Sequence, residues 1–299
     1  MRRHTAADSD YLLPPELLRK LERAAIQSRR VMIGRTKGER RSAKRGTSVE
    51  FADYRSYVPG DDLRYLDWNA YARLQRLFIK LFHEEEDLHV YALLDASASM
   101  GFGAPSKLDF GVRAAAALGY MGLCGGDRVQ LYARSDGAPV RSRQFRGRGC
   151  AMEMFEWLKG LHPHGETQLP EAVDTLLRTQ PAPGVVFLIS DLLSEQWQEA
   201  VARLAVGDCD VCLLQVFARE EVRPELQGDL RLVDAETGAE REITMGQRTM
   251  RDYERARDEF LGEVRAACNR YGFSWLFATS DQSLDDVLLR SMRRLGVVR

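Results

Sequence analysis

The chain has 299 residues, with 43 Lys and Arg against 44 Asp and Glu and a formal net charge of −1. Hydrophobic residues make up 44% and charged residues 29%, which is typical of globular proteins and excludes collagen-like, coiled-coil and wholly disordered chains. The charge is unevenly spread, because residues 1–46 carry 13 basic and 5 acidic side chains whereas residues 87–299 carry 25 and 31. A basic head therefore precedes an acidic body.

The first residues lack the apolar core of a secretory signal, and no apolar run approaches the roughly 18 residues that span a bilayer. Five cysteines form no framework of regular spacing, which favours a reducing compartment. Cys209 and Cys212 form a CxxC inside an apolar run that predicts a buried strand, so we interpret them as core thiols. We expect a cytoplasmic protein without a membrane span.

Two kinds of pattern follow one another along the chain. Residues 14–30 have helical spacing, residues 29–46 form a basic loop, and residues 70–82 again favour a helix. Beyond residue 87, apolar strands alternate with helices, which predicts an α/β fold with a doubly wound, mostly parallel sheet. We therefore expect an N-terminal helical and loop extension over residues 1–86 and an α/β domain over residues 87–299.

The expected elements of the α/β domain follow in chain order. Strands are predicted at 88–94, 128–133, 140–145, 185–190, 211–217 and 273–279. Helices are predicted at 107–124, 151–160, 170–178, 195–206, 247–270 and 283–294. Residues 230–234 and 241–244 predict a hairpin.

Polar side chains follow two of these strands where each strand ends. Asp95, Ser97 and Ser99 come after the first strand, Asp191 follows the strand at 185–190, and Thr167 lies on a loop between them. Carboxylate and hydroxyl oxygens at the carboxyl edge of a parallel sheet suit a hard cation such as Mg²⁺. If the hydroxyls bound the metal directly, they would add no negative charge. The metal would then keep an open position for a carboxylate from another protein.

This pattern resembles the metal-ion-dependent adhesion site of von Willebrand factor A domains. A second motif lies upstream and reads Glu50-Phe51-x-Asp53-x-Arg55-x-Tyr57-x-x-Gly60-Asp61-Asp62-x-Arg64-x-x-Asp67-Trp68-x-x-x-Ala72-Arg73. It is similar to the signature of a bacterial family catalogued as domain of unknown function fifty-eight, which places it before a von Willebrand factor A-like domain. The resemblance covers about residues 30–290, although Glu166 departs from a simple Gly-Gly-Thr loop before Thr167.

The resemblance implies both a site and a role. By it, Asp95, Ser97, Ser99, Thr167 and Asp191 match the positions that ligate Mg²⁺ or another divalent cation. It further implies a non-enzymatic adaptor of the subgroup without membrane helices, acting with a MoxR-type AAA+ ATPase in the assembly or maturation of other proteins. A protein partner would offer an Asp or Glu to the metal.

The signature segment, residues 50–73, admits two interpretations. It holds five acidic residues, three arginines and six aromatic residues. Paired arginines and carboxylates would hold the segment together, which we favour. Alternatively, the aromatic residues and arginines form a partner interface.

Two other function classes stay open. A metal-dependent phosphohydrolase would use Asp95 and Asp191 as direct ligands, with His162 and His164 near the site. Residues 101–108 have only the outline of a phosphate-binding loop, without the Gly before the lysine or the hydroxyl after it. The basic segment 29–45 would bind nucleic acid, but it lacks interleaved aromatic residues and the body is acidic, so this class is less favoured.

Overall fold

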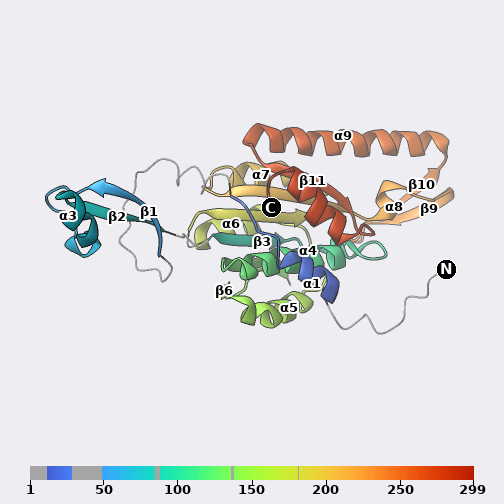
Figure 1. Ribbon diagram of the computed structural model, residues 1–299. Helices are drawn as coiled ribbons and strands as arrows, with labels where there is room; N and C mark the ends of the chain where they lie inside the picture. Colours follow the sequence, from blue (N-terminus) through green and yellow to red (C-terminus); the bar gives the residue numbers. More distant parts are fainter. Residues whose placement is uncertain (1–11, 29–48, 85–87, 136–137, 181) are drawn as a thin grey trace. The chain divides into compact units, whose positions relative to one another are not determined.

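The computed structural model describes residues 12–28, 49–84, 88–135, 138–180 and 182–299. The chain divides into two compact units, one over Lys37–Asp87 and the other formed by Met1–Thr36 together with Leu88–Arg299 (Figure 1). We call the described part of the first, residues 49–84, the small unit, and the other the α/β unit. The predicted division into residues 1–86 and 87–299 stays a prediction, and residues 12–28 group with the α/β unit.

A seven-stranded sheet forms the centre of the α/β unit. Its order is β11-β8-β7-β3-β4-β5, with β6 also paired to β4, and the five strands from β11 to β4 run parallel. The bounds are β3 His89–Leu94, β4 Arg128–Ser135, β5 Ala138–Arg141, β6 Phe145–Arg146, β7 Gly184–Ser190, β8 Asp210–Phe217 and β11 Ser274–Thr279. This sheet confirms the predicted α/β class with a mostly parallel sheet. The strand order reverses between β3 and β7, so a crevice is expected at their carboxyl ends.

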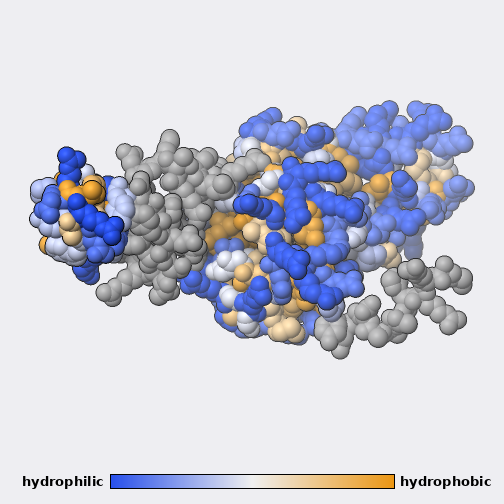
Figure 2. Space-filling model, viewed as in Figure 1, coloured by the Kyte–Doolittle hydropathy of each residue, from blue (hydrophilic) through white to orange (hydrophobic). Residues whose placement is uncertain are grey.

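Helices cover both faces of this sheet. The main ones are α1 Pro15–Leu21, α4 Lys107–Cys124, α5 Ala151–Lys159, α6 Leu169–Thr179, α7 Trp197–Leu204 and α9 Gln247–Tyr271. Helices α1, α4 and α5 lie on one side, and α7 and α9 on the other (Figure 1). Figure 2 shows that the outer face of α9 is hydrophilic. Near the C-terminus a π-helical turn, Asp285–Ser291, continues into α10 Met292–Arg294.

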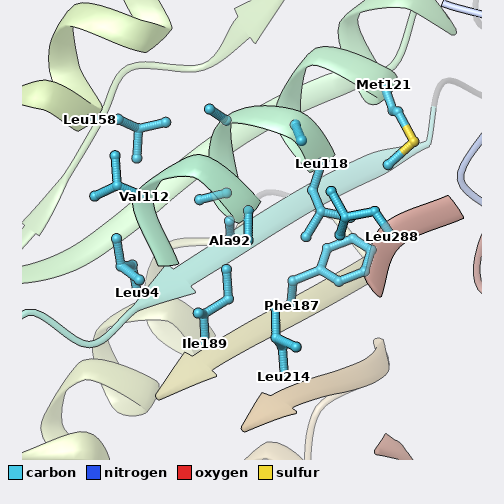
Figure 3. Packing of buried hydrophobic residues seen from close by; sticks show 14 of the residues in the cluster. Ala92, Leu94, Val112, Leu118, Met121, Leu158, Phe187, Ile189, Leu214 and Leu288 are labelled. Carbon is cyan, nitrogen blue, oxygen red and sulfur yellow. The ribbon is translucent and has the colours of Figure 1, made fainter. Parts of the chain in front are cut away.

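Successive residues of the central strands point into two separate cores. In β3, Ala92 and Leu94 pack under α4, whereas Tyr91 and Leu93 point to the side of α6 and α7. Figure 3 shows the first of these cores, where side chains of β3, β7 and β8 lie against α4. Because both faces are buried, the strands are continuously apolar, which is why the sequence predicts them well.

The N-terminal helix is shorter than its predicted range, 14–30. Helix α1 ends at Leu21, and Ile26 instead forms an antiparallel bridge with Val298. Ala25 and Arg299 exchange backbone hydrogen bonds of 3.3 and 2.8 Å. The chain after α1 is therefore extended, because the C-terminal segment offers it β-type partners.

The small unit is a two-stranded antiparallel sheet with a short helix. It contains β1 Val49–Ser56, a 3₁₀ turn Leu63–Tyr65, α3 Trp68–Leu74 and β2 Phe78–Glu84. The helix predicted over residues 70–82 is therefore wrong in its second half. Gln75 adopts a left-handed backbone conformation, φ 51°, which ends α3, and the apolar run after it pairs with β1. Short apolar runs do not distinguish a helix from a strand.

Charged groups hold the small unit together. Arg55 donates two hydrogen bonds to Asp61, of 2.6 and 2.7 Å. Asp67 is buried, accepts from two backbone N–H groups at the start of α3, and also accepts from Tyr54 Oη at 2.7 Å and Lys80 Nζ at 3.2 Å. These contacts agree with the structural interpretation of the signature segment.

Apolar side chains of the small unit remain exposed. Trp68 is 64% exposed and Leu74 62%, and Figure 2 shows hydrophobic residues on the surface of this unit. These exposures agree with the alternative, a partner interface, which stays a hypothesis.

The structure also bears on the expectations about the CxxC cysteines and about membrane-spanning helices. Within the described residues Cys209 and Cys212 form no disulfide and are buried, and burial raises the pKa of Cys212 to about 12, so the interpretation as core thiols is confirmed. Among the described residues, no helix combines the length and the apolar character needed to cross a membrane.

Gly184 on β7 lies where this strand packs closely against β3, and both strands lead into the site. A Cβ at this position would lie 2.0 Å from the carbonyl oxygen of His89 on β3. We expect Gly184→Ala to lower the free energy of unfolding by about 2–3 kcal/mol, measured by denaturant titration. Gly262→Ala is the control, because its Cβ meets open space on the exposed face of α9, and a gain of about 0.5 kcal/mol is expected. Equal effects of the two variants would contradict the packing argument.

Asp67 makes the small unit sensitive to acid. Hydrogen bonds, first from the Ala70 backbone and then from Tyr54, lower the pKa of Asp67 from 3.8 to about 2. Because the folded-state pKa is depressed, this stabilisation is present above about pH 4 and is lost as the pH falls towards 2. We expect amide exchange in α3, corrected for its intrinsic pH dependence, to accelerate over this range. In Asp67→Asn, which keeps an acceptor oxygen but cannot titrate, the same acceleration would show that another group is responsible.

Candidate functional site

The predicted site residues lie where the strand order reverses. Strands β3 and β7 are neighbours with Leu94 opposite Ile189, and the Asp95 N–H donates to the Ile189 carbonyl at 2.9 Å. This pairing places the loop after β3 next to the loop that begins with Asp191. The carboxyl ends of β3 and β7 are therefore the place where these polar residues meet.

A chain of hydrogen bonds connects four of the five predicted residues. Asp95 accepts from the Ser97 N–H at 3.0 Å and from Ser190 Oγ at 2.6 Å. Ser97 Oγ lies 3.1 Å from Ser99 Oγ, and Ser99 Oγ donates to Asp191 Oδ2 at 3.2 Å. The two hydroxyls thus lie between two buried carboxylates.

The fifth residue, Thr167, is held nearby by its loop. The Ala98 N–H donates to Gly165 O and the His164 N–H to Ala96 O, both at 2.9 Å, so this loop runs beside the segment after β3. The Thr167 hydroxyl donates to Glu236 Oε1 at 2.6 Å, and its N–H donates to Glu236 Oε2 at 2.9 Å. Thr167 therefore belongs to the same loop cluster but hydrogen-bonds a residue that sequence analysis places only in a hairpin turn.

Lys107 is the main feature that sequence analysis did not assign to the site. Its side chain is 1% exposed, and Nζ lies 2.6 Å from Asp191 Oδ2 and 2.6 Å from Glu221 Oε1. In the sequence, Lys107 attracts notice only as the end of an incomplete phosphate loop. The available signal is a lysine in the first turn of a mostly apolar helix, since a buried lysine requires a carboxylate partner.

This ion-pair cluster also argues against a phosphate site at residues 101–108. The Lys107 ammonium points into the protein towards Asp191 and Glu221, rather than towards a phosphate in solvent.

Burial and mutual repulsion shape the ionisation of the site. Burial, with a further contribution from the Asp191 charge, raises the pKa of Asp95 to about 6. Burial alone would lower the pKa of Lys107, but Asp191 and Glu221 outweigh it and the pKa is raised. Burial also raises the pKa of Glu221. Two carboxylates, Asp191 and Glu221, thus contact one ammonium, and the charge of Asp95 interacts with that of Asp191, so the surplus negative charge favours a further cation.

The donor set fits a hard cation. Among the described residues, no three His, Cys, Asp or Glu side chains cluster as a metal site. The oxygens that do converge are the hydroxyls of Ser97 and Ser99 with the carboxylates of Asp95 and Asp191, which are ligand types that Mg²⁺ accepts together with water. The role of these residues and of Thr167 as metal ligands stays a prediction.

The phosphohydrolase and nucleic-acid alternatives rely on two histidines and on the basic segment, respectively. His162 and His164 are exposed on the loop before α6. The basic segment 29–45 falls outside the described residues.

Curated proteins of mycobacteria are similar to almost the whole chain. The uncharacterized protein Rv1480 of Mycobacterium tuberculosis is 27% identical over 292 residues, which cover 95% of this chain and 92% of the relative. The uncharacterized protein Mb1516 of Mycobacterium bovis matches to the same extent.

Solved structures that are similar to part of this chain include BatB and the SpRpn10 VWA domain. The conserved hypothetical protein BatB from Bacteroides thetaiotaomicron has a TM-score of 0.43 at 15% identity, covering 70% of this chain and 98% of BatB. The SpRpn10 VWA domain has a TM-score of 0.40 at 12% identity, covering 69% of this chain and 96% of that domain.

The match of a family model tests the family that the two motifs predict. The model of the family described as protein of unknown function DUF58 matches residues 53–260, which is more than half of the sequence. The match spans most of the signature segment and all five predicted ligand positions, and the prediction is confirmed: this chain belongs to the DUF58 family.

Proposed function

We propose that this protein is a non-enzymatic adaptor that binds a protein partner through a Mg²⁺ site at the carboxyl ends of β3 and β7. The observation that carries the proposal is the pair of hydroxyls, Ser97 and Ser99, held between two buried carboxylates with negative charge in excess. The residues that would hold the metal are Asp95, Ser97, Ser99, Thr167 and Asp191.

The chemistry of this set suits recognition of an acidic side chain. When bound, Mg²⁺ would supply a Lewis-acidic centre for a carboxylate of the partner. Serine and threonine hydroxyls position that centre without neutralising it. Lys107 offsets part of the charge of Asp191, which further limits how far the protein itself neutralises a bound cation.

The state of the carboxylates supports binding rather than phosphohydrolysis. Both oxygens of Asp95 accept hydrogen bonds, from the Ser97 N–H and from Ser190 Oγ. Both oxygens of Asp191 are also engaged, by the Leu193 N–H and by Lys107 Nζ. These four oxygens are engaged in positioning the two carboxylates, which suits contact with a metal through water better than the direct ligation that the phosphohydrolase would use.

The proposed partner is a MoxR-type AAA+ ATPase or one of its clients, as the family resemblance implies. Such a partner would contribute an Asp or Glu on an exposed loop. The proposed role is the assembly or maturation of other proteins.

The metal requirement can be measured with purified components. We expect a MoxR-type ATPase to be retained by the immobilised full chain in Mg²⁺ and lost in EDTA, with at least about tenfold weaker binding for Asp95→Ala and Ser99→Ala. Mn²⁺ titration by electron paramagnetic resonance should show the same order of metal affinities. Ser194→Ala is the matched control, because its hydroxyl accepts from Gln196 N outside the site. Equal retention under all conditions would contradict the metal bridge, and phosphatase activity that follows Mg²⁺ would favour the enzymatic alternative.

Lys107 provides a second test that needs no partner. Lys107→Met removes an ammonium 2.6 Å from Asp191, so we expect divalent cations to bind at least about tenfold more tightly than in the wild type. In EDTA the variant should lose about 3–5 kcal/mol of stability, because it leaves buried carboxylates without their partner. Mg²⁺ should restore part of that loss, measured as a rise in Tm larger than in the wild type.

The matched control is Lys159→Met, which removes a lysine from an exposed ion pair with Glu156. Its stability should change by less than about 1 kcal/mol, without dependence on Mg²⁺. If Lys107→Met were destabilised equally with and without Mg²⁺, the argument that a cation competes with Lys107 would fail.

A further inference from the structure

The hairpin of β9 Gly228–Val233 and β10 Glu240–Met245 brings a carboxylate of this chain onto Thr167. The two strands pair in register from Val233 opposite Glu240 to Gly228 opposite Met245. Most of their side chains are exposed, so little buried apolar surface fixes the hairpin to the rest of the α/β unit. An isolated two-stranded hairpin is only marginally stable in water. The position of the hairpin therefore depends on the contacts at its tip.

The tip is an ordered turn that presents Glu236. Asp234 Oδ1 accepts from the Glu236 N–H at 2.9 Å, the Thr237 N–H at 2.7 Å and the Thr237 hydroxyl at 2.9 Å. These donors, with the Thr237 backbone first, lower the pKa of Asp234. Gly238 supplies the positive φ of 70° that closes the turn. The conformation of Glu236 is thus set locally before it reaches Thr167.

Glu236 meets Thr167 with both carboxylate oxygens. The distances are 2.6 Å to the Thr167 hydroxyl and 2.9 Å to its N–H, across 69 residues of sequence. An N–H and an O–H that converge on one carboxylate form a charge-assisted pair of hydrogen bonds. Thr167 is itself 9% exposed, and Glu236 engages both its N–H and its hydroxyl.

We propose that Glu236 is an internal ligand that occupies the binding position of the partner's carboxylate, and that a partner binds by replacing it. The inference rests on the proposed function in one respect, since it takes Thr167 as part of the partner-binding site. The partner is a protein with an exposed Asp or Glu, and the β9–β10 hairpin moves away when that residue binds.

Because Glu236 is tethered to the site, the proposed partner is a protein segment rather than a small acid. A group tethered within the same chain has an effective concentration that reaches the millimolar range even for a flexible connection. A free carboxylate at lower concentration does not displace it. A protein partner adds contacts outside Thr167, which make replacement favourable.

The contact is tested first without metal, in the full chain. Amide exchange at Thr167 is measured in a chelator for the wild type, Glu236→Ala and the control Glu242→Ala, which removes an exposed carboxylate of the same hairpin. We expect at least about tenfold faster exchange in Glu236→Ala and no change in Glu242→Ala. Equal exchange in wild type and Glu236→Ala would overturn the inference.

The second measurement tests whether another carboxylate takes the position. With Mn²⁺ present, acetate is added against chloride at equal ionic strength. We expect acetate to restore slow exchange at Thr167 in Glu236→Ala and to leave the wild type unchanged. Faster exchange in Glu236→Ala that acetate does not reverse, despite bound Mn²⁺, would overturn replacement.

The two proposals fail in different ways. If the wild type binds no Mn²⁺ in the resonance titration, the proposed metal-dependent function fails. The exchange measurement in chelator still decides whether Glu236 covers Thr167. If Mn²⁺ binds and Glu236→Ala leaves exchange at Thr167 unchanged, only the internal ligand is refuted.

Discussion

A buried ammonium ties together the loops on which the site depends. Lys107 stands in the first turn of α4, Asp191 follows β7, and Glu221 lies in α8 Arg219–Val222 after β8. Taking these charges out of water costs several kcal/mol each, and only close pairing offsets that cost. The 2.6 Å contacts from Lys107 to both carboxylates therefore require the three segments to keep one arrangement.

The same constraint extends beyond the site residues through Glu221. Its second carboxylate oxygen accepts from the Ala218 N–H at 2.6 Å, which fixes the start of α8. Its backbone carbonyl accepts from the Tyr253 hydroxyl of α9, also at 2.6 Å. A shift of Lys107 on cation binding would thus alter the contacts that Glu221 makes with α8 and α9. These elements flank the β9–β10 hairpin in sequence.

Much of the fold follows from local patterns in the sequence. Central parallel strands such as β3 and β7 are buried on both faces, so their apolar runs are continuous and are predicted nearly to the residue. The apolar run after Gln75 is less easily predicted from its pattern. It is short, and only its pairing with β1 makes it a strand. The segment after α1 is extended for a similar reason, because its partner is the distant C-terminus.

The site divides in the same way between local and distant information. Asp95, Ser97, Ser99 and Asp191 are visible in the sequence because they directly follow apolar strands. Lys107, Glu221 and Glu236 are not, because their partners lie 84, 114 and 69 residues away. Nothing in local spacing specifies such pairs. They emerge only once the strand order has brought the loops together.

The charges of the site favour exchange of carboxylates over their simple addition. Asp95, Asp191 and Glu221 outnumber the ammonium of Lys107 by two negative charges, which one divalent cation would balance. Glu236 then adds a single negative charge at Thr167. A partner carboxylate that replaces Glu236 leaves this balance unchanged, whereas one that binds beside it adds repulsion in a low-dielectric setting. Exchange therefore carries little electrostatic penalty, and the choice of partner depends on contacts outside the carboxylate itself.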